Sequence, residues 1–318
     1  MMRANLQNYS PLLEDTVIQQ LVQWGKRQPL VCAVILASSR AIPHAYTDLF
    51  SDYDVILVLH EIKPFYNDRS WLETFGSVLA LYRDPLSLDR GFERAAYVTQ
   101  YESGLKIDFT IWPVELLKSI ASQSQLPPEF DAGYQVLVDK TQLTDGLQPP
   151  TYSAYIPKPP TDIQYQTIME EFFLDTTYVA KFLWRDDLMA AKHILDHSLK
   201  QEYLRRMLEW RIEIDHAWSV KPGPYGRGLK RWLPPDVWAD LEDTYTGADL
   251  DSNWTALFRT IDLMRRIAIE VGLRLGYSYP DNLEGRVRSY LFRVRESDRH
   301  RRGIKTIDQG YRNFSCQQ

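Results

Sequence analysis

The first half of the chain combines one helical pattern with several short apolar runs. Residues 14–27 carry apolar side chains at helical spacing after an acidic start, which predicts an amphipathic helix. Residues 30–39 and 54–60 are almost continuously apolar and rich in Val, Ile and Leu, a pattern typical of strands buried on both faces. Two β-prone runs within residues 95–113 flank a glycine-containing turn and predict a hairpin, and residues 134–140 predict a further strand.

The second half of the chain is helical in pattern. Residues 163–218 and 250–275 repeat apolar side chains at intervals of three and four, which predicts a helical bundle. Residues 142–162 contain five prolines and no periodicity, as is typical of a linker between domains. We therefore expect an α+β protein in which an N-terminal domain, with a mixed β-sheet flanked by helices, is followed by a C-terminal α-helical bundle.

The same change of pattern sets the expected domain boundaries. Residues 1–150 are expected to form the sheet-containing domain, residues 151–162 a proline-rich linker, and residues 163–290 the helical domain. Residues 291–318 are expected to form a basic C-terminal tail, in which arginines first alternate with apolar residues. A solvated helix with a frayed end accounts for this tail, and contact with a nucleic acid or another anion is the alternative.

Charge and composition narrow the classes of function. The 318-residue chain has a net charge of −5, and residues 1–150 carry 12 Lys and Arg against 18 Asp and Glu. This acidic excess argues against a broad nucleic-acid surface and fits a site that takes up cations. The cysteines are Cys32 and Cys316, too few for a disulfide framework or a cysteine metal site. Without a membrane-length apolar stretch or a signal-peptide pattern, we expect no membrane association and a cytoplasmic location.

Two aspartates stand where a buried strand begins. Asp52 and Asp54 are two residues apart, so they share one face of the strand, with Tyr53 on the other face. Two neighbouring carboxylates repel each other unless a cation lies between them. Mg²⁺ prefers one or two carboxylates together with phosphate oxygens, which points to a bound nucleoside triphosphate. The alternative is a solvated strand end without a metal.

Two further features favour the metal hypothesis. The preceding strand ends in Ser38, Ser39 and Arg40, a turn that can offer small side chains, backbone N–H groups and a positive charge to phosphates. Asp108 lies alone among apolar residues in a later strand, where an uncompensated charge is costly. Three carboxylates on adjacent strands beside a small-residue turn predict a two-metal site for in-line nucleotidyl transfer.

These motifs resemble a known family. A small dipeptide, a spacer, an apolar-flanked D-x-D and a later isolated aspartate are similar to the polymerase-β-type nucleotidyltransferase superfamily. More narrowly, residues 30–280 resemble the aminoglycoside 6-adenylyltransferases, which modify streptomycin. The segments that carry this resemblance include "SSRAIPHAYTDLFSDYDVILVL", "LKIDFTIWP", "QVLVDK", "EFFLDTTYVAKFLWRDDLMAAKHI" and "NWTALFRTIDLMRRIAIEVGLRLGYSYP".

The resemblance implies roles for individual residues. Asp52 and Asp54 would bind Mg²⁺, and Asp108 would be the third carboxylate, either as a metal ligand or as the base for the attacking hydroxyl. Ser39 and Arg40 match the phosphate-contacting turn of the family. Lys181 matches a lysine on the first long helix of the second domain that reaches the triphosphate of ATP.

One position departs from the family pattern. The motif usually begins with Gly-Ser, whereas this chain has Ser38 followed by Ser39. A glycine at the first position permits a positive φ angle or a close backbone approach, so a serine there is expected to cost about 1 kcal/mol of strain or to narrow the phosphate pocket.

The implied acceptor is a polycation, whose pocket should contain carboxylates and aromatic faces. Glu170, Glu171 and Asp175 stand at the expected head of a helix, with Tyr178 one turn further on, and we predict that they bind the aminoglycoside. The alternative is that these acidic residues only complement the helix dipole. We expect the active site to lie in the cleft between the two domains.

The predicted function is Mg²⁺-dependent transfer of AMP from ATP to a hydroxyl of an aminoglycoside, with release of pyrophosphate. Streptomycin is the favoured acceptor. One alternative keeps this chemistry and changes the acceptor to another small molecule or to a protein side chain. Another is a non-catalytic nucleotide-binding or antitoxin-like module. The sequence leaves the oligomeric state open.

Overall fold

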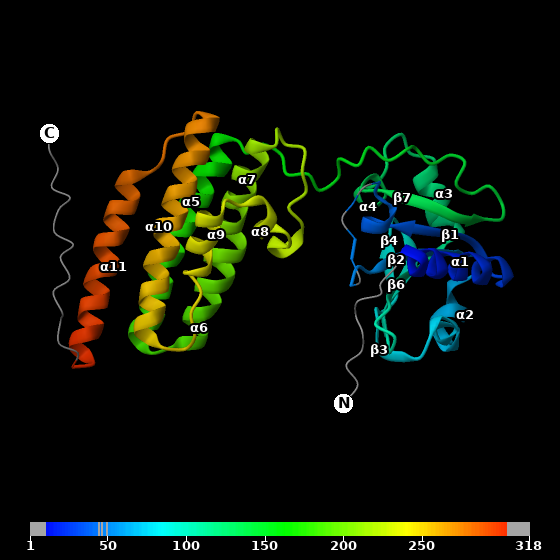
Figure 1. Ribbon diagram of the computed structural model, residues 1–318, viewed down its shortest axis with the longest axis horizontal. Coiled ribbons are helices and arrows are strands. Elements are labelled where there is room, and N and C mark those ends of the chain that lie inside the picture. The colour runs from blue at the N-terminus through cyan, green and yellow to red at the C-terminus, as the bar shows by residue number, and fades with distance from the viewer. Residues whose placement is uncertain (1–10, 44, 46, 49, 304–318) are drawn as a thin grey trace. The chain divides into compact units, whose positions relative to one another are not determined.

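The computed structural model describes residues 11–43, 45, 47–48 and 50–303. It divides into two compact units, Met1–Tyr155 and Ile156–Gln318, and the division falls within the proline-rich stretch of the sequence. Each unit is described by itself. Figure 1 shows a sheet with helices in the first unit and helices throughout the second. In the described part of the chain, no helix is both long and apolar enough to cross a membrane.

The first unit is built on a seven-stranded sheet in the order β3-β5-β6-β2-β1-β7, with β4 paired to β5 beside this path. Strands β2 and β6 run parallel, whereas the other pairs are antiparallel, so the expected mixed sheet is confirmed. The strands are β1 (Val31–Ala37), β2 (Tyr53–Leu59), β3 (Val78–Arg83), β4 (Ser87–Asp89), β5 (Phe92–Tyr101), β6 (Lys106–Pro113) and β7 (Tyr134–Asp139).

Helices cover both faces of this sheet. Leu21 and Trp24, from the predicted N-terminal helix, pack against one face together with Phe109. Leu117 and Trp112 belong to a second cluster on the other face. Strands β1 and β2 are therefore buried on both faces, as their apolar sequence predicts. The helical elements are α1 (Pro11–Arg27), η1 (Ser38–Ala41), α2 (Ile62–Asn67), η2 (Ser70–Phe75), α3 (Val114–Ala121) and α4 (Pro128–Asp131).

The predicted hairpin is formed by β5 and β6, which pair in antiparallel fashion around the expected turn. Strands β3 and β4 were not expected from the sequence. They lie toward the β5 side of the sheet and expose several apolar side chains, including Leu79, Tyr82 and Leu88. The apolar run of β3 (residues 78–82) was present in the sequence but was not singled out, whereas the three residues of β4 are too few to show a strand pattern.

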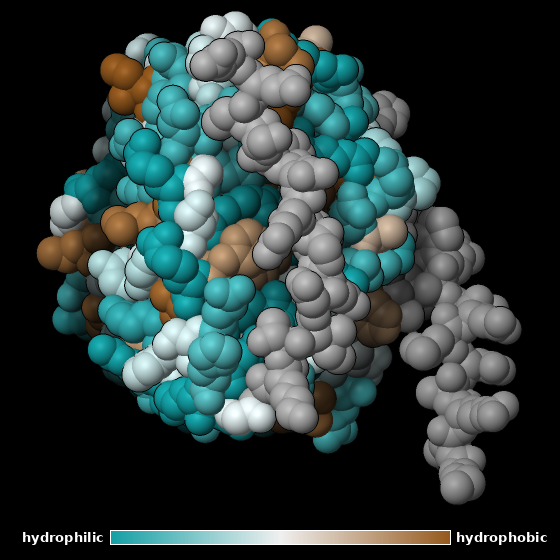
Figure 2. Space-filling view, turned by 90° about the vertical axis from the view of Figure 1, so that its left-hand side faces the viewer, coloured by the Kyte–Doolittle hydropathy of each residue, from teal (hydrophilic) through white to brown (hydrophobic). Residues whose placement is uncertain are grey.

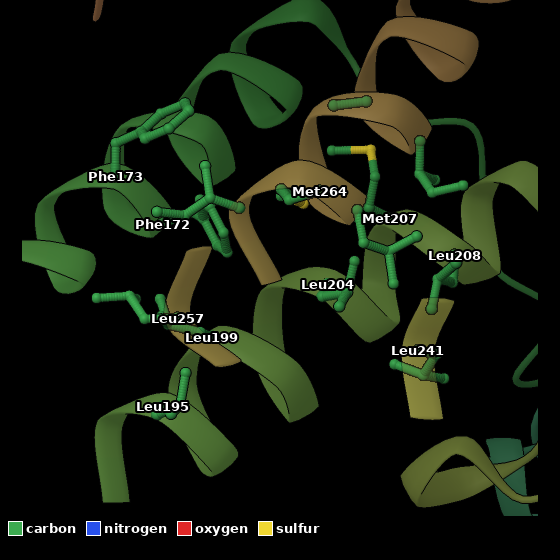
Figure 3. Packing of buried hydrophobic residues seen from close by; sticks show 14 of the residues in the cluster. Phe172, Phe173, Leu195, Leu199, Leu204, Met207, Leu208, Leu241, Leu257 and Met264 are labelled. Carbon is green, nitrogen blue, oxygen red and sulfur yellow. The ribbon is translucent and has the colours of Figure 1, made fainter. Parts of the chain in front are cut away.

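The second unit is a helical bundle, as predicted. The helix α5 starts at a capping box formed by Thr161 and Gln164. Figure 3 shows side chains of α5 meeting those of other helices, including Leu199, Met207 and Met264, in one apolar core. The elements are α5 (Asp162–Arg185), α6 (Leu188–Lys192), the π-helical η3 (His193–Leu204), α7 (Arg205–Asp215), η4 (Pro224–Gly226), α8 (Leu229–Trp232), α9 (Pro235–Glu242), α10 (Leu250–Leu275) and α11 (Asp281–Arg301).

Helix α11 crosses the expected boundary between helical domain and basic tail at residue 290. It is part of the bundle, because Leu291 is buried and the fully buried Asp298 accepts a hydrogen bond from the Trp254 indole. Residues 304–318 of the expected tail lie outside the described residues.

On the face seen in Figure 2, apolar residues are mostly scattered among hydrophilic ones.

Candidate active site

The three predicted aspartates lie on neighbouring strands of the first unit. In the parallel pair β2 and β6, Asp54 is the register partner of Asp108. Asp52 directly precedes β2, and Tyr53, between the two aspartates, is fully buried in the core. Alternation along the strand therefore directs Asp52 and Asp54 away from this core and toward the side of Asp108.

The electrostatics of Asp54 reflect this crowding. Burial, and then repulsion from Asp108 and Asp52, raise its pKa from 3.8 to about 6, against the opposing effects of a hydrogen bond from Ser38 and the charge of Lys106. Burial also raises the pKa of Asp108, although Lys106 opposes this shift. The Oδ1 atom of Asp108 is buried and accepts no hydrogen bond from the described residues.

A lysine that the sequence analysis missed lies between two of the carboxylates. The ammonium Nζ of Lys106 is 2.5 Å from Asp52 Oδ2 and 2.8 Å from Asp108 Oδ2. Burial alone would lower the pKa of Lys106, but the hydrogen bonds to Asp108 and Asp52 outweigh it and raise this pKa. The signal was present in the sequence, because Lys106 and Asp108 are two residues apart on a strand and so share a face.

The donor atoms of this site suit Mg²⁺, which prefers carboxylate oxygens. Asp54 and Asp108 face each other across the sheet register, and Asp108 offers an oxygen without a hydrogen bond. The three aspartates do not form a closed set of ligands, however. Within the described residues, no group of three or more His, Cys, Asp or Glu side chains is arranged to hold a metal ion.

The turn after β1 begins with Ser38, where the family pattern has glycine, and its backbone has the positive φ angle that glycine permits. Ser38 has φ = 62°, in the left-handed region that favours glycine. Its side chain also donates a hydrogen bond to the carboxylate of Asp54. Ser39, the next residue, is half-buried in the short helix η1. The serine at position 38 thus combines a strained backbone with a polar contact that glycine cannot make.

The structure gives Arg40 a contact different from the expected one. Its guanidinium donates to the carbonyl of Ser51, at 2.7 Å from Nη2, and to that of Asp52, at 3.2 Å from Nε. It also lies 4.0 Å over the ring of Tyr53. Arg40 therefore holds the loop that leads into β2, and its contact with phosphate stays a prediction.

Lys181, predicted to reach the triphosphate, lies on α5 in the second unit. Its ammonium is 4.4 Å from the ring centroid of Tyr178 and 5.1 Å from that of Phe182. It contributes to a cavity of about 400 Å³, which is lined by Lys181, Trp184, Arg185, Tyr290, Arg293, Val294 and Ser297. Cationic and aromatic side chains in one cavity suit an anion that carries a ring.

The predicted acceptor residues also lie on α5, but not at its head. The helix begins at Asp162, so Glu170, Glu171 and Asp175 lie well inside it, and their expected position at the helix start is wrong. Favourable interaction with the helix dipole is limited to the first turn, so it does not explain these carboxylates. Glu170, Glu171 and Tyr178 are exposed, whereas Asp175 is half-buried.

Tyr203 extends this acidic surface and was not expected. Its hydroxyl donates a hydrogen bond to Asp175 Oδ2 at 3.2 Å. Burial, followed by the charges of Asp175, Glu171 and Glu202, raises the pKa of Tyr203 to about 12. Because Tyr203 comes from η3, its meeting with α5 is a tertiary contact that no local sequence pattern reveals.

Comparison with known proteins identifies the family. The family model described as streptomycin adenylyltransferase matches residues 13–294. The chain belongs to this family. It is therefore an enzyme of the nucleotidyltransferase class, in agreement with the resemblance drawn from its motifs.

Individual relatives carry a consistent name. An aminoglycoside 6-adenylyltransferase of Bacillus subtilis (strain 168) is 28% identical over 278 residues, which cover 86% of this chain and 94% of the relative. One of Campylobacter jejuni is 26% identical over 285 residues, covering 89% and 96%. A crystal structure of an aminoglycoside 6-adenyltransferase from Bacillus subtilis covers 92% of this chain and 99% of its own, with 23% identity and a TM-score of 0.42.

Proposed function

We propose that this enzyme transfers AMP from ATP to a hydroxyl of an aminoglycoside and releases pyrophosphate. Streptomycin is the first candidate for this acceptor. The observation that carries the proposal is the pairing of Asp54 with Asp108 across the parallel strands, beside the Ser38 turn. Relatives named aminoglycoside 6-adenylyltransferase, which cover most of this chain, support an aminoglycoside as the acceptor.

In the proposed reaction, the acceptor oxygen forms a bond to the α-phosphorus of ATP while the bond from that phosphorus to the pyrophosphate oxygen breaks. Asp52 and Asp54, with Asp108 as the third carboxylate, would hold Mg²⁺, and the metal would supply positive charge that offsets the negative charge of the reacting phosphate. Asp108 is either a further ligand of the metal or the group that accepts or orients the proton of the attacking hydroxyl. In the second role, the pKa that burial raises makes it a better base than an ordinary aspartate. Ser38 orients the Asp54 carboxylate through its hydrogen bond.

The second unit contributes binding groups in this proposal. Glu171 and Asp175, with the Tyr203 hydroxyl held on Asp175, form an acidic and aromatic surface that suits the cationic groups of an aminoglycoside. Glu170 and Tyr178 add a further charge and a further ring on the same helix. Lys181 and its neighbours Arg185 and Arg293 suit the phosphates of ATP.

Pyrophosphate release tests the proposal. The protein is incubated with ATP and Mg²⁺ and with each member of an aminoglycoside panel, and the products are examined by mass spectrometry. We expect release only with an accepted drug, together with an AMP adduct on streptomycin, and loss of release in Asp54→Asn and Asp108→Asn. Tight binding of ATP without release for any aminoglycoside would refute the proposed acceptor and favour another substrate or a non-catalytic role.

A further inference from the structure

Lys106 makes the closest charged contacts of the candidate active site. Its ammonium bridges Asp52 and Asp108, at 2.5 Å and 2.8 Å, and the three side chains are 27%, 38% and 26% exposed. Lys106 and Asp108 both belong to β6, whereas Asp52 comes from the loop before β2. The lysine therefore ties the loop that carries Asp52 to the neighbouring strand.

The contacts of Lys106 involve the same carboxylates that the proposed metal would need. The ammonium contacts one oxygen, Oδ2, of each of two residues assigned to Mg²⁺ in the proposed function. An ammonium and a divalent cation bound to the same two carboxylates lie a few ångströms apart and repel each other strongly. Removal of the ammonium without a replacement would leave three carboxylates on adjacent strands, which is also unfavourable.

Arg40, a nearby guanidinium from η1, has a different role. It donates to the backbone carbonyls of Ser51 and Asp52 and lies over the ring of Tyr53. It thus fixes the backbone of the loop, whereas Lys106 contacts the carboxylate side chains. Lys106 brings its positive charge directly to both carboxylates of the Asp52 and Asp108 pair.

We propose that Lys106 is a built-in counter-ion that holds the carboxylate site together before Mg²⁺ binds and that must leave Asp52 and Asp108 when the metal arrives. This inference rests on the metal site of the proposed function and adds a positioning residue to it. Competition with Lys106 weakens the binding of free Mg²⁺. The metal is then held well only when the phosphates of ATP supply further oxygens, so the site favours the metal that arrives with its nucleotide.

Mg²⁺ binding to the full-length, EDTA-treated protein tests this inference. Calorimetric titration and thermal unfolding, both without nucleotide, compare the wild type with Lys106→Met, which keeps the length of the side chain and removes its charge. Lys63→Met is the matched control, because Lys63 is an exposed lysine on α2 of the same unit. Lys106→Arg keeps the charge at the site.

We expect Lys106→Met to bind Mg²⁺ about tenfold more tightly than the wild type, because the competing charge is gone. Its metal-free form should melt at a lower temperature than the wild type and recover on addition of Mg²⁺, since the metal then replaces the missing cation. Lys63→Met should match the wild type in both measurements, and Lys106→Arg should retain weak metal binding.

Two results would overturn the inference in different ways. Equal Mg²⁺ affinities of the wild type and Lys106→Met would show that the lysine does not compete with the metal, and the proposed function would stand. No Mg²⁺ binding by either protein, even with a non-hydrolysable ATP analogue, would overturn the metal site of the proposed function itself.

Discussion

Asp54 offers a quantitative test of the electrostatics of the site. Its pKa is raised from 3.8 to about 6, mainly by burial and by the neighbouring Asp108, which means that its ionised form opposes folding at neutral pH. A shift of this size corresponds to about 2–3 kcal/mol for a half-buried carboxylate. Asp54→Asn removes the charge and keeps an oxygen that can accept the hydrogen bond from Ser38, so the metal-free variant should be more stable than the wild type.

The stabilisation should depend on pH in a defined direction. At about pH 3 and below, the carboxyl is mostly protonated in both the folded and the unfolded state, so the wild type and Asp54→Asn should differ little. The advantage of the variant should grow as the pH rises toward about 6 and be complete at about pH 7.5. A gain of 2–3 kcal/mol corresponds to a rise of about 4–12 °C in the melting temperature of a unit of this size.

Scanning calorimetry in EDTA, over a series of pH values, measures the difference in melting temperature between the wild type and Asp54→Asn. The relevant signal is the unfolding transition of the first unit. Asp52→Asn is the matched control, because it removes an equal charge but also removes a partner of Lys106, and it should not be stabilising. Three results would refute the reasoning. Asp54→Asn could melt at the same temperature as the wild type at pH 7.5, or its rise in melting temperature could be the same at every pH. Asp52→Asn could also show an equal rise in melting temperature.

The remaining predictions concern the turn and the acceptor surface. Ser38→Gly and Ser38→Ala both lose the hydrogen bond to Asp54, but only glycine relieves the strain of the positive φ angle. In chemical unfolding, Ser38→Gly should therefore be about 1 kcal/mol more stable than Ser38→Ala. Equal stabilities of the two variants would contradict strain at this position. Glu171→Gln should raise the KM for the aminoglycoside about tenfold and leave the KM for ATP unchanged in steady-state kinetics, whereas equal effects on both would indicate a structural role. Tyr203→Phe removes a donor to Asp175 and should raise the pKa of that carboxyl, as followed by NMR titration; an unchanged pKa would show that the hydrogen bond is not maintained in solution.

The sequence by itself determined the fold class and the main chemical groups. Continuous apolar runs predicted β1 and β2, and regular apolar spacing predicted the helical bundle, because both patterns depend only on local geometry. Alternation along a strand was enough to put Asp52 and Asp54 on one face. The expected strain at Ser38 followed from a comparison with the usual glycine, and the structure has φ = 62° there.

Only the tertiary structure decided how these groups meet. The pairing of Asp54 with Asp108 and the bridge from Lys106 to Asp52 join residues 54 apart in the chain, and they depend on the register between β2 and β6. The sequence alone did not predict this register, because it is set by packing and hydrogen bonding across the whole sheet. The contact of Arg40 with loop carbonyls arises from tertiary packing in the same way. The sequence therefore supplied the carboxylates of the site, whereas the folded sheet decided which cation lies between them.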